Sequence, residues 1–544
     1  MKQYLSNMTF SKCFVEILEN NKIKDICICP GSRNTPISLS FLNNSFFRCT
    51  SHIDERAAAF FSLGIAKALQ KPNVVLSTSG TAVANLLPAV IESDLSTTPL
   101  IVITADRPKR LHNKGENQTI EQKNIFRDFT RKSIHIEVSS LNSKSVFQKV
   151  QNTIDQCVGI KGKNPPGPIH INIAFDEPLV DEIKNKKITL KKNIIKQKDE
   201  IVTIPNSKRP LIICGRINNE FSLKDITDLS KKINAPILSD SLSGLRYNIK
   251  DENILSYYDF FINSINQKPD LIIRLGKKPV SKKLNGFLKK LKSRTILLTK
   301  YNGYNDDTKT IYVSSFKNIR AKKSTDNKWL RKIINLEKKA EKIITKFYNK
   351  NYFFEGNIIY SCLKNIDNND NLFIGNSMCV RNLDQFCPNI DKKINIYSNR
   401  GASGIDGLIA TAIGTAHVNK KTKTTLIMGD VSFFYDLNSL LIARQQKINI
   451  NIIVINNNGG QIFNTLPYAK KDIKDFEKYW ETPVDLSIKK ICDLYGANYS
   501  SFDSIDKINN KLNSILKKPR INIIEIKCDK KNKFKIEKEI KQQF

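Results

Sequence analysis

Short apolar runs of strand length recur along this chain, and they constrain its fold more than any other feature. The runs lack the polar alternation of a half-exposed strand, so each predicts a strand buried on both faces of a parallel sheet. In the N-terminal part these runs are Ile26–Cys29, Val74–Ser77, Leu100–Thr104 and Ile169–Ile173. Helix-like patterns at Arg56–Leu69 and Ala82–Ser93 lie between them, so we predict an α/β domain over residues 1–180.

The same pattern predicts two further α/β domains. We place the central domain at residues 206–325 and the third at residues 345–544, with a Lys-rich linker over residues 181–205. The strands expected in them are Leu211–Gly215, Ala235–Ser239, Leu271–Leu275, Leu372–Ile374, Thr424–Met428, Ile450–Ile455 and Ile521–Ile526. A chain of 544 residues exceeds what one hydrophobic core usually serves, which agrees with three doubly wound parallel-sheet domains.

Cysteine, histidine and apolar content exclude several classes of site. The 11 Cys are scattered, and Cys27 and Cys29 alternate within an apolar run, so buried reduced thiols are expected. Five widely spaced His argue against a His-based metal site and against a Ser-His-Asp triad. No apolar run approaches the roughly 20 residues that span a bilayer, and the N-terminus lacks the apolar segment of a signal peptide. We therefore expect a cytoplasmic protein without a membrane partner.

The net charge of +36 raises the question of nucleic-acid binding. The excess Lys is spread along the chain, with concentrations at Lys184–Lys198 and Lys517–Lys541. Few Arg occur in these runs, no aromatic residues interleave with them, and no nucleic-acid motif is present. Abundant Lys, Asn and Ile are what an AT-biased coding sequence produces. We therefore expect no nucleic-acid partner, with a general attraction of anionic substrates as the other interpretation of the charge.

Polar turns follow three of the N-terminal strands. They are Pro30-Gly31-Ser32-Arg33, Thr78-Ser79-Gly80-Thr81 and Ala105-Asp106-Arg107-Pro108. Ligands of parallel α/β sheets bind just beyond the carboxyl ends of the strands, so these turns predict a ligand site.

A second site is predicted where Gly429-Asp430 follows one strand and Asn456–Gly460 follows the next. We expect a helix from near Ser432 to Gln445 between these strands, with its first N–H groups facing an anion. Mg²⁺ prefers hard oxygen ligands, which Asp430, Asn457 and the main chain of Gly459 supply. Gly429, Gly459 and Gly460 would permit positive φ and close backbone approach. Either segment alone could be a turn, but together they indicate a metal and diphosphate site.

This Gly-Asp and Asn pattern resembles that of thiamine-diphosphate enzymes. The resemblance implies thiamine diphosphate held through Mg²⁺, or alternatively Mn²⁺, with Asp430, Asn457 and Gly459 as metal ligands. It places the cofactor against Gly429, Asp430, Val431, Ser432, Asn457, Gly459, Gly460, Ile462, Phe463 and Ile405. Ile405 would support the V-shaped conformation of the cofactor.

The resemblance also assigns a catalytic carboxylate. Thiamine diphosphate reacts through a carbanion at C2, which forms when a carboxylate hydrogen-bonds N1′ of its pyrimidine. Glu55, at the entry of a small and apolar helix, fits this role, and we expect it to be largely buried with a raised pKa. Asp54 is expected to cap the same helix.

Motifs along the chain narrow the resemblance to one family, the 2-succinyl-5-enolpyruvyl-6-hydroxy-3-cyclohexene-1-carboxylate synthases of menaquinone biosynthesis. They are PGSRNTPIS (30–38), HIDERAAAFFSLGIAKA (52–68), TSGTAVANLLPAVIES (78–93), PLIVITADRP (99–108), NQTIEQ (117–122), GNSMCVRNLD (375–384), SNRGASGIDG (398–407) and NNNGGQIFNTLP (456–467). The match covers most of the first and third domains and is weaker in the middle. It implies decarboxylation of 2-oxoglutarate and addition of the succinyl carbanion equivalent to isochorismate. A related thiamine-diphosphate decarboxylase, or an acetolactate-synthase-like enzyme, is the alternative.

The substrates of that reaction carry several carboxylates, and the resemblance assigns residues to bind them. They are Ser32, Arg33, Arg107, Gln118, Lys282, Ser377, Arg381 and Arg400. Arg suits this task because its planar guanidinium binds a carboxylate through two hydrogen bonds. Two positions depart from the family: Lys283 replaces an Arg, and Glu116 replaces a small residue. The resemblance further implies a homodimer or homotetramer in which Glu55 and Asp430 meet across a subunit interface.

Overall fold

The computed structural model describes residues 5–140, 143–184, 190, 200–218, 220–291, 293–302, 306–471, 473–528, 536, 538–540 and 542–544. They form two compact units, described separately below. The first unit comprises described residues of 1–197 with 399–419 and 436–446, and the second comprises those of 198–398, 420–435 and 447–544. Most of the predicted linker 181–205 and part of the Lys-rich run 517–541 lie outside the described residues.

A six-stranded parallel sheet forms the centre of the first unit, in the order β2-β1-β3-β4-β6-β5. Its strands are β1 (Asp25–Ile28), β2 (Arg48–Ser51), β3 (Asn73–Ser77), β4 (Leu100–Asp106), β5 (Lys132–Glu137) and β6 (Pro168–Ala174). The four interior strands are buried along their whole length. Burial on both faces explains their continuous apolar sequence.

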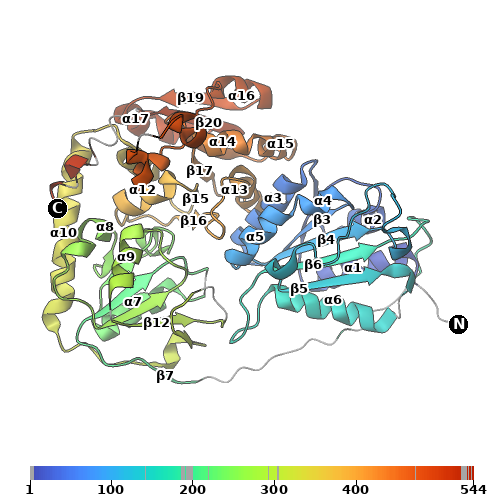
Figure 1. Ribbon diagram of the computed structural model, residues 1–544, viewed down its shortest axis with the longest axis horizontal. Helices are drawn as coiled ribbons and strands as arrows, with labels where there is room; N and C mark the ends of the chain where they lie inside the picture. Colours follow the sequence, from blue (N-terminus) through green and yellow to red (C-terminus); the bar gives the residue numbers. More distant parts are fainter. Residues whose placement is uncertain are drawn as a thin grey trace. The chain divides into compact units, whose positions relative to one another are not determined.

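Helices cover both faces of this sheet (Figure 1). On one face lie α1 (Asn7–Asn20), α2 (Thr35–Leu42) and α6 (Ser143–Cys157), and on the other lie α3 (Glu55–Leu69) and α5 (Leu87–Leu95). Phe10 and Phe14 of α1 pack with Phe147 of α6 over alternate strand residues in one core. The unit also contains α4 (Thr81–Ala84), α13 (Leu408–Val418) and α15 (Leu440–Gln445).

Helices α3 and α13 touch backbone to backbone at two glycines. An added Cβ on Gly64 would lie 2.1 Å from the carbonyl oxygen of Thr411, and one on Gly414 would lie 2.1 Å from that of Phe61. No side chain intervenes there, so the crossing requires glycine on both helices.

The second unit contains two more six-stranded parallel sheets, in the orders β10-β9-β8-β11-β12-β13 and β16-β15-β17-β18-β20-β19. The strands of the first are β8 (Pro210–Cys214), β9 (Ile237–Ser239), β10 (Ile254–Leu255), β11 (Leu271–Leu275), β12 (Arg294–Thr299) and β13 (Thr310–Tyr312). Those of the second are β15 (Asn371–Ile374), β16 (Asn395–Tyr397), β17 (Thr424–Gly429), β18 (Ile450–Asn456), β19 (Asn498–Phe502) and β20 (Ile521–Lys527). A small sheet pairs β7 (Val202–Thr203) with β14 (Ile319–Arg320).

The helices of the second unit are α7 (Leu223–Ile233), α8 (Tyr258–Phe261), α9 (Lys282–Lys290), α10 (Asn327–Asn349), α11 (Glu355–Lys364), α12 (Met378–Phe386), α14 (Asp430–Tyr435), α16 (Ile488–Tyr495) and α17 (Ile505–Leu516). Among the described residues, no helix is long and apolar enough to cross a membrane.

Three parallel six-stranded sheets with flanking helices confirm the predicted α/β class. The limits 1–180, 206–325 and 345–544 stay a prediction. None of the 11 Cys, all of which lie within the described residues, forms a disulfide, as expected, and Cys27 and Cys29 are buried.

Two predicted helices are interrupted. The helix expected at Ala82–Ser93 is divided into α4 and α5. Pro88 lies in the first turn of α5, where a backbone N–H has no acceptor within the helix, so a proline favours the start of a new helix there. The helix expected from Ser432 to Gln445 begins at Asp430, ends at Tyr435 and resumes only at Leu440. The break falls at Asp436, whose buried carboxylate accepts hydrogen bonds from the N–H groups of Ile409 and Ala410.

Candidate functional site

The predicted metal ligands lie at the ends of two adjacent strands of the second unit. Strands β17 and β18 pair directly, so Asp430 and Asn457 follow neighbouring strand ends. Asp430 is 3% exposed, and its Oδ2 accepts a 2.7 Å hydrogen bond from the N–H of Gly459. The structure therefore brings Asp430 and the Asn457–Gly459 turn together.

The side chain of Asn457 is oriented by a residue that the sequence did not predict. Its Nδ2 donates a 2.8 Å hydrogen bond to Oε1 of Glu355, at the first position of α11. Its Oδ1 is buried and accepts no hydrogen bond from the described residues. A buried amide oxygen without a donor is costly in a folded protein, so this atom is suited to a cation.

Burial also shapes the chemistry of Asp430. Burial raises the pKa of this carboxyl, the nearby charge of Glu355 acts in the same direction, and the N–H groups of Gly459 and Val431 oppose them, so the pKa lies at about 6. One carboxylate oxygen and one unsatisfied amide oxygen form a donor set that fits a hard divalent cation.

The loop after Asn457 depends on glycine at one position. Gly459 has a φ of +128°, and a Cβ there would lie 2.6 Å from the carbonyl oxygen of Glu481. Gly460 donates its N–H to that same oxygen. The expectation of a positive φ was wrong for Gly429 and Gly460, neither of which has one.

The other residues assigned to the cofactor's diphosphate end flank these ligands. Val431 and Ser432 lie in α14, and Ser432 is buried. Because α14 begins at Asp430, Ser432 is its third residue and not its start. Ile462 and Phe463 are half-buried and lead into a short 3₁₀ turn at Phe463–Thr465.

Glu55 lies in the first unit, at the first residue of α3. Asp54 caps this helix as predicted, because its Oδ1 accepts a 3.0 Å hydrogen bond from the N–H of Ala57. Asn85 donates to Oε2 of Glu55 at 3.3 Å. We expected Glu55 to be largely buried, but within this unit it is only half-buried. The first turn of α3 lies where the strands end.

Contacts join the polar turns that follow the strands of the first unit. Arg107 donates from Nη1 to Oγ of Ser79 at 2.6 Å and to the carbonyl oxygen of Gln118 at 2.8 Å. Arg33 donates to the carbonyl oxygen of Phe175 at 3.1 Å, and its side chain is 11% exposed. Burial lowers the pKa of Arg107, and the charge of Arg33 lowers it further, so the two guanidinium groups are close enough to repel each other.

Gln118 is exposed, with a φ of +51°. Gln122, which the sequence analysis missed, supports this segment from below, because its Oε1 accepts the N–H of Gly80 at 2.9 Å. Ser32 is exposed beside Arg33, and Glu116 is exposed as well. The charge of Glu116 raises the pKa of Arg107 and so opposes the effect of Arg33.

A buried ion pair holds the segment that contains Arg400. The carboxylate of Glu92 accepts hydrogen bonds from the N–H groups of Gly401 and Ala402 and from Nζ of Lys67. Lys67 also donates to Oδ1 of Asn399 at 2.8 Å. Arg400 and Ile405 are half-buried in this segment. One Lys and one Glu, each within a largely apolar stretch of its helix, were the signal that could have revealed this pair.

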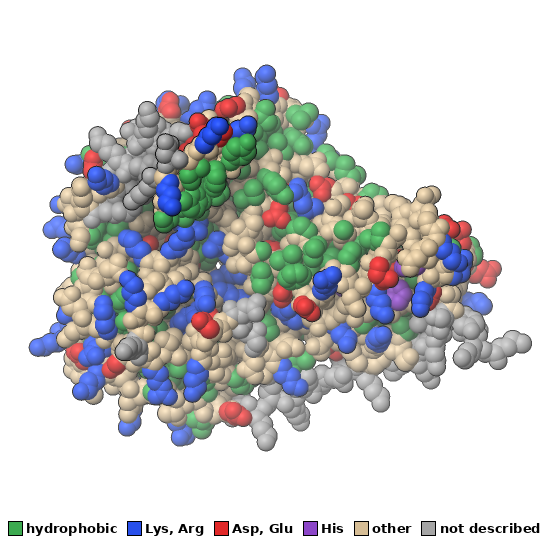
Figure 2. Space-filling model, in the orientation of Figure 1, with side chains coloured by type: hydrophobic (Ala, Val, Ile, Leu, Met, Phe, Trp, Pro, Cys, Tyr) green, Lys and Arg blue, Asp and Glu red, His purple; other side chains and the backbone are tan. Residues whose placement is uncertain are grey.

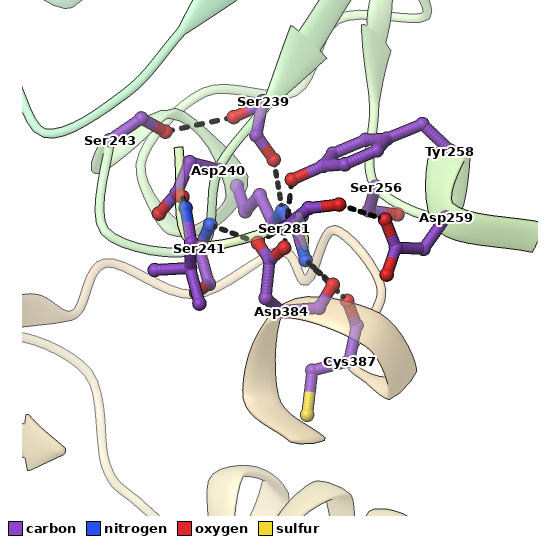
Figure 3. Close-up of polar contacts among 12 residues, drawn as sticks. Ser239, Asp240, Ser241, Ser243, Ser256, Tyr258, Asp259, Ser281, Asp384 and Cys387 are labelled. Atoms are coloured by element: carbon purple, nitrogen blue, oxygen red, sulfur yellow. Dashed lines mark hydrogen bonds and ion pairs between the residues drawn. The ribbon is translucent and has the colours of Figure 1, made fainter. Parts of the chain in front are cut away.

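Ser377 precedes helix α12 and Arg381 lies in its first turn, and the other end of this helix is fixed in a polar cluster. Ser377 has a φ of +62°, and its carbonyl oxygen accepts a 2.5 Å hydrogen bond from Arg381. Figure 3 shows Asp384 of α12 among Ser241 and Tyr258, which donate to its carboxylate at 2.8 Å each. The fully buried Arg246 donates to the same carboxylate at 2.9 Å. The cluster fixes the position of α12 within the second unit.

Lys282 is exposed at the first residue of α9, and within the described residues no hydrogen bond or ion pair joins it to the other candidates. Lys283 donates to the carbonyl oxygen of Asp259 at 3.0 Å.

On the face shown in Figure 2, Lys and Arg side chains are scattered among other residues and do not form one continuous stripe. That distribution gives no support to the nucleic-acid interpretation of the net charge.

Comparison with known proteins identifies the family. Residues 8–125 match the family "Thiamine pyrophosphate enzyme, N-terminal TPP binding domain", residues 180–374 match "Middle domain of thiamine pyrophosphate", and residues 379–526 match "Thiamine pyrophosphate enzyme, C-terminal TPP binding domain". A 2-succinyl-5-enolpyruvyl-6-hydroxy-3-cyclohexene-1-carboxylate synthase of Listeria welshimeri is 34% identical over 95% of this chain and 94% of its own length. The chain belongs to this synthase family.

Relatives in other genera carry the same name. The synthase of Staphylococcus epidermidis is 34% identical over 92% of this chain and 91% of its own length. That of Bacillus velezensis is 31% identical over 97% of this chain and 96% of its own length. The similarity to this synthase family therefore spans the central part of the chain as well as its two ends.

Proposed function

We propose that this protein decarboxylates 2-oxoglutarate and adds the resulting succinyl carbanion equivalent to isochorismate. The products would be 2-succinyl-5-enolpyruvyl-6-hydroxy-3-cyclohexene-1-carboxylate and CO₂, in menaquinone biosynthesis. Similarity to synthases of this name along nearly the whole chain carries the proposal. The Asp430–Gly459 contact and the oriented amide of Asn457 support it, because they supply the hard oxygen donors that a metal–diphosphate site needs.

Thiamine diphosphate is the cofactor, as the three family matches indicate, and we propose that Mg²⁺ or Mn²⁺ joins it to the protein. The ligands would be the carboxylate of Asp430, Oδ1 of Asn457 and the carbonyl oxygen of Gly459. Bound thiamine diphosphate supplies the carbanion on which the 2-oxo acid reacts. Gly429, Val431, Ser432, Gly460, Ile462 and Phe463 would line its diphosphate end, and Ile405 its central part.

Glu55 would hold a hydrogen bond to the pyrimidine ring of the cofactor. Its half-burial within the first unit leaves one side of the carboxylate for the ligand, which supports this role. The same observation supports a homodimer or homotetramer in which a second subunit covers Glu55.

The paired guanidinium groups of Arg33 and Arg107 would attract and orient the substrate carboxylates. Two like charges held close together raise the local positive potential, and each Arg offers a planar fork for a carboxylate. Ser32 and Gln118 would add neutral hydrogen bonds there. Ser377, Arg381, Arg400 and Lys282 complete the proposed substrate set.

The test is turnover by the purified protein with thiamine diphosphate and Mg²⁺. We expect CO₂ release from 2-oxoglutarate and coupling of the remaining four-carbon unit to isochorismate. No product from this pair, under conditions where the cofactor binds, would refute the proposal. A preference for pyruvate would instead favour the alternative, a related 2-oxo acid decarboxylase or an acetolactate-synthase-like enzyme.

Glu55→Gln tests the catalytic assignment. The amide cannot share its proton with the pyrimidine as a carboxylate does, so turnover should fall by at least about 100-fold while calorimetry still detects cofactor binding. The matched control is Glu252→Gln, which changes an exposed Glu in a turn of the second unit and should leave turnover unchanged. Near-normal turnover in E55Q would contradict the assignment.

A further inference from the structure

Glu355 is a buried acid that joins two amide side chains in the second unit. It is 4% exposed at the first residue of α11. Its Oε1 accepts a 2.8 Å hydrogen bond from Asn457, and its Oε2 accepts one of 2.8 Å from Asn382. One carboxylate oxygen is thus committed to the candidate metal ligand and the other to helix α12.

This contact determines which end of the Asn457 amide faces Glu355. An ionised carboxylate only accepts hydrogen bonds, so it selects the NH₂ group, and a flipped amide would bring two oxygens together. With Nδ2 engaged, Oδ1 must point away from Glu355, and it is buried there without a hydrogen bond from the described residues. This orientation leaves Oδ1, the one atom of the amide that can bind a cation, available to the metal.

The carboxylate is itself held in place from its other side. Asn382 lies in α12, and two residues further along Asp384 anchors that helix to Ser241 and Tyr258 (Figure 3). Arg246 also donates a hydrogen bond to Asp384. A metal ligand is positioned well only when its orienting partner has its own fixed support. Glu355 has that support in the described structure.

We propose that Glu355 is a positioning residue that orients Asn457 toward the metal and adds a second negative charge beside Asp430. This inference rests on the proposed function, since it assumes that Asp430 and Asn457 bind a divalent cation. It predicts that metal affinity depends on a residue that does not itself ligate the metal.

The direct test is Mn²⁺ binding measured by electron paramagnetic resonance in the presence of thiamine diphosphate. In Glu355→Gln the new side-chain amide can turn its NH₂ toward Asn457, so the side chain of Asn457 is no longer held in one orientation. The substitution also removes one negative charge. Mn²⁺ should bind about 10–100-fold more weakly, the usual effect of losing an orienting partner. The matched control is Glu337→Gln, another buried Glu, which accepts hydrogen bonds from Ser256 and Tyr257 and should leave Mn²⁺ affinity unchanged.

A charge-conserving exchange separates orientation from general damage. In Glu355→Gln with Asn457→Asp, the new Gln donates its NH₂ to one oxygen of the new Asp and leaves the other for the metal. Asn457→Asp should therefore improve Mn²⁺ affinity at least about 10-fold more in the E355Q background than in the wild-type background, where two carboxylates would face each other. If E355Q alone folds poorly, the double variant can be compared with N457D instead. The double variant must then bind Mn²⁺ more tightly than N457D does.

The outcomes distinguish the two proposals. If wild-type protein with thiamine diphosphate binds no Mn²⁺ or Mg²⁺, the proposed function fails. If wild-type protein binds Mn²⁺ but E355Q binds it equally well, or the exchange shows no coupling, the positioning role of Glu355 is overturned while the proposed function stands.

Discussion

Replacing Gly64 by Ala tests how helix α3, which begins with Glu55, is packed against α13. The new Cβ would lie 2.1 Å from the carbonyl oxygen of Thr411, 2.9 Å from its carbonyl carbon and 3.0 Å from Cα of Gly414. All three are backbone atoms, so no side chain can rotate away. The helices must instead move apart by about 1 Å, which disturbs a close-packed interface.

The expected loss of stability follows from two opposing effects. Overpacking of this kind costs about 1–3 kcal/mol and occasionally more, and a backbone clash belongs at the upper end. Ala stabilises a helix by about 1 kcal/mol relative to Gly. The net loss should be about 2 kcal/mol, which lowers the melting temperature by about 4–8 °C in a unit of this size.

Gly286→Ala is the matched control, because Gly286 lies in the interior of α9 with no atom within 4 Å of an added Cβ. There only the helix preference acts, so the variant should gain about 0.5–1 kcal/mol. Thermal unfolding followed by circular dichroism should give shifts of opposite sign for the two variants. A G64A protein that melts at or above the wild-type temperature would refute the packing argument.

Three further predictions concern charged groups. Glu92→Gln leaves Lys67 buried without its carboxylate and should cost about 3–5 kcal/mol, so an unchanged melting temperature would contradict the role of the pair. Arg107→Lys removes the planar fork and should raise KM for the anionic substrates about 10-fold, measured by steady-state kinetics; an unchanged KM would show that Arg107 does not bind them. Burial and the charge of Asp384 raise the pKa of Asp240 from its ordinary value of 3.8 to about 7. Between these two pH values the folded protein keeps a proton on Asp240 that the unfolded chain has released. Stability should therefore fall as pH rises between these values, and the melting temperature relative to Asp240→Asn should be lower at pH 7.5 than at pH 5. A constant difference between the two proteins would contradict that shift.

The strands that the sequence predicted are all interior ones. In the sheet of the first unit, β1, β3, β4 and β6 were predicted, whereas the two edge strands β2 and β5 were missed. The same division holds in the sheet of β15 to β20, whose missed strands β16 and β19 are both edges. Edge strands are partly exposed and carry polar residues, as in Lys132–Glu137, so they lack the continuous apolar signal. The interior strand β12 was also missed, since its first residues are polar and exposed.

The candidate site divides in a similar way. Sequence placed Asp430, Asn457, Arg33 and Arg107 at strand ends, because such positions can be recognised from the preceding apolar run. It did not reveal Glu355, which lies 102 residues from Asn457 and follows no strand. Local pattern thus identifies residues that can bind a ligand, but not the buried partners that orient them.

The sequence by itself determined the parallel α/β class and the residue types available at the strand ends. Burial on both faces makes an interior strand apolar throughout, so its end is visible in the sequence alone. Tertiary structure decided that Glu55 is half-buried, that Gly64 meets Thr411, and that the amide oxygen of Asn457 faces away from Glu355. These features depend on contacts between segments far apart in the chain, and only packing determines which buried polar groups meet.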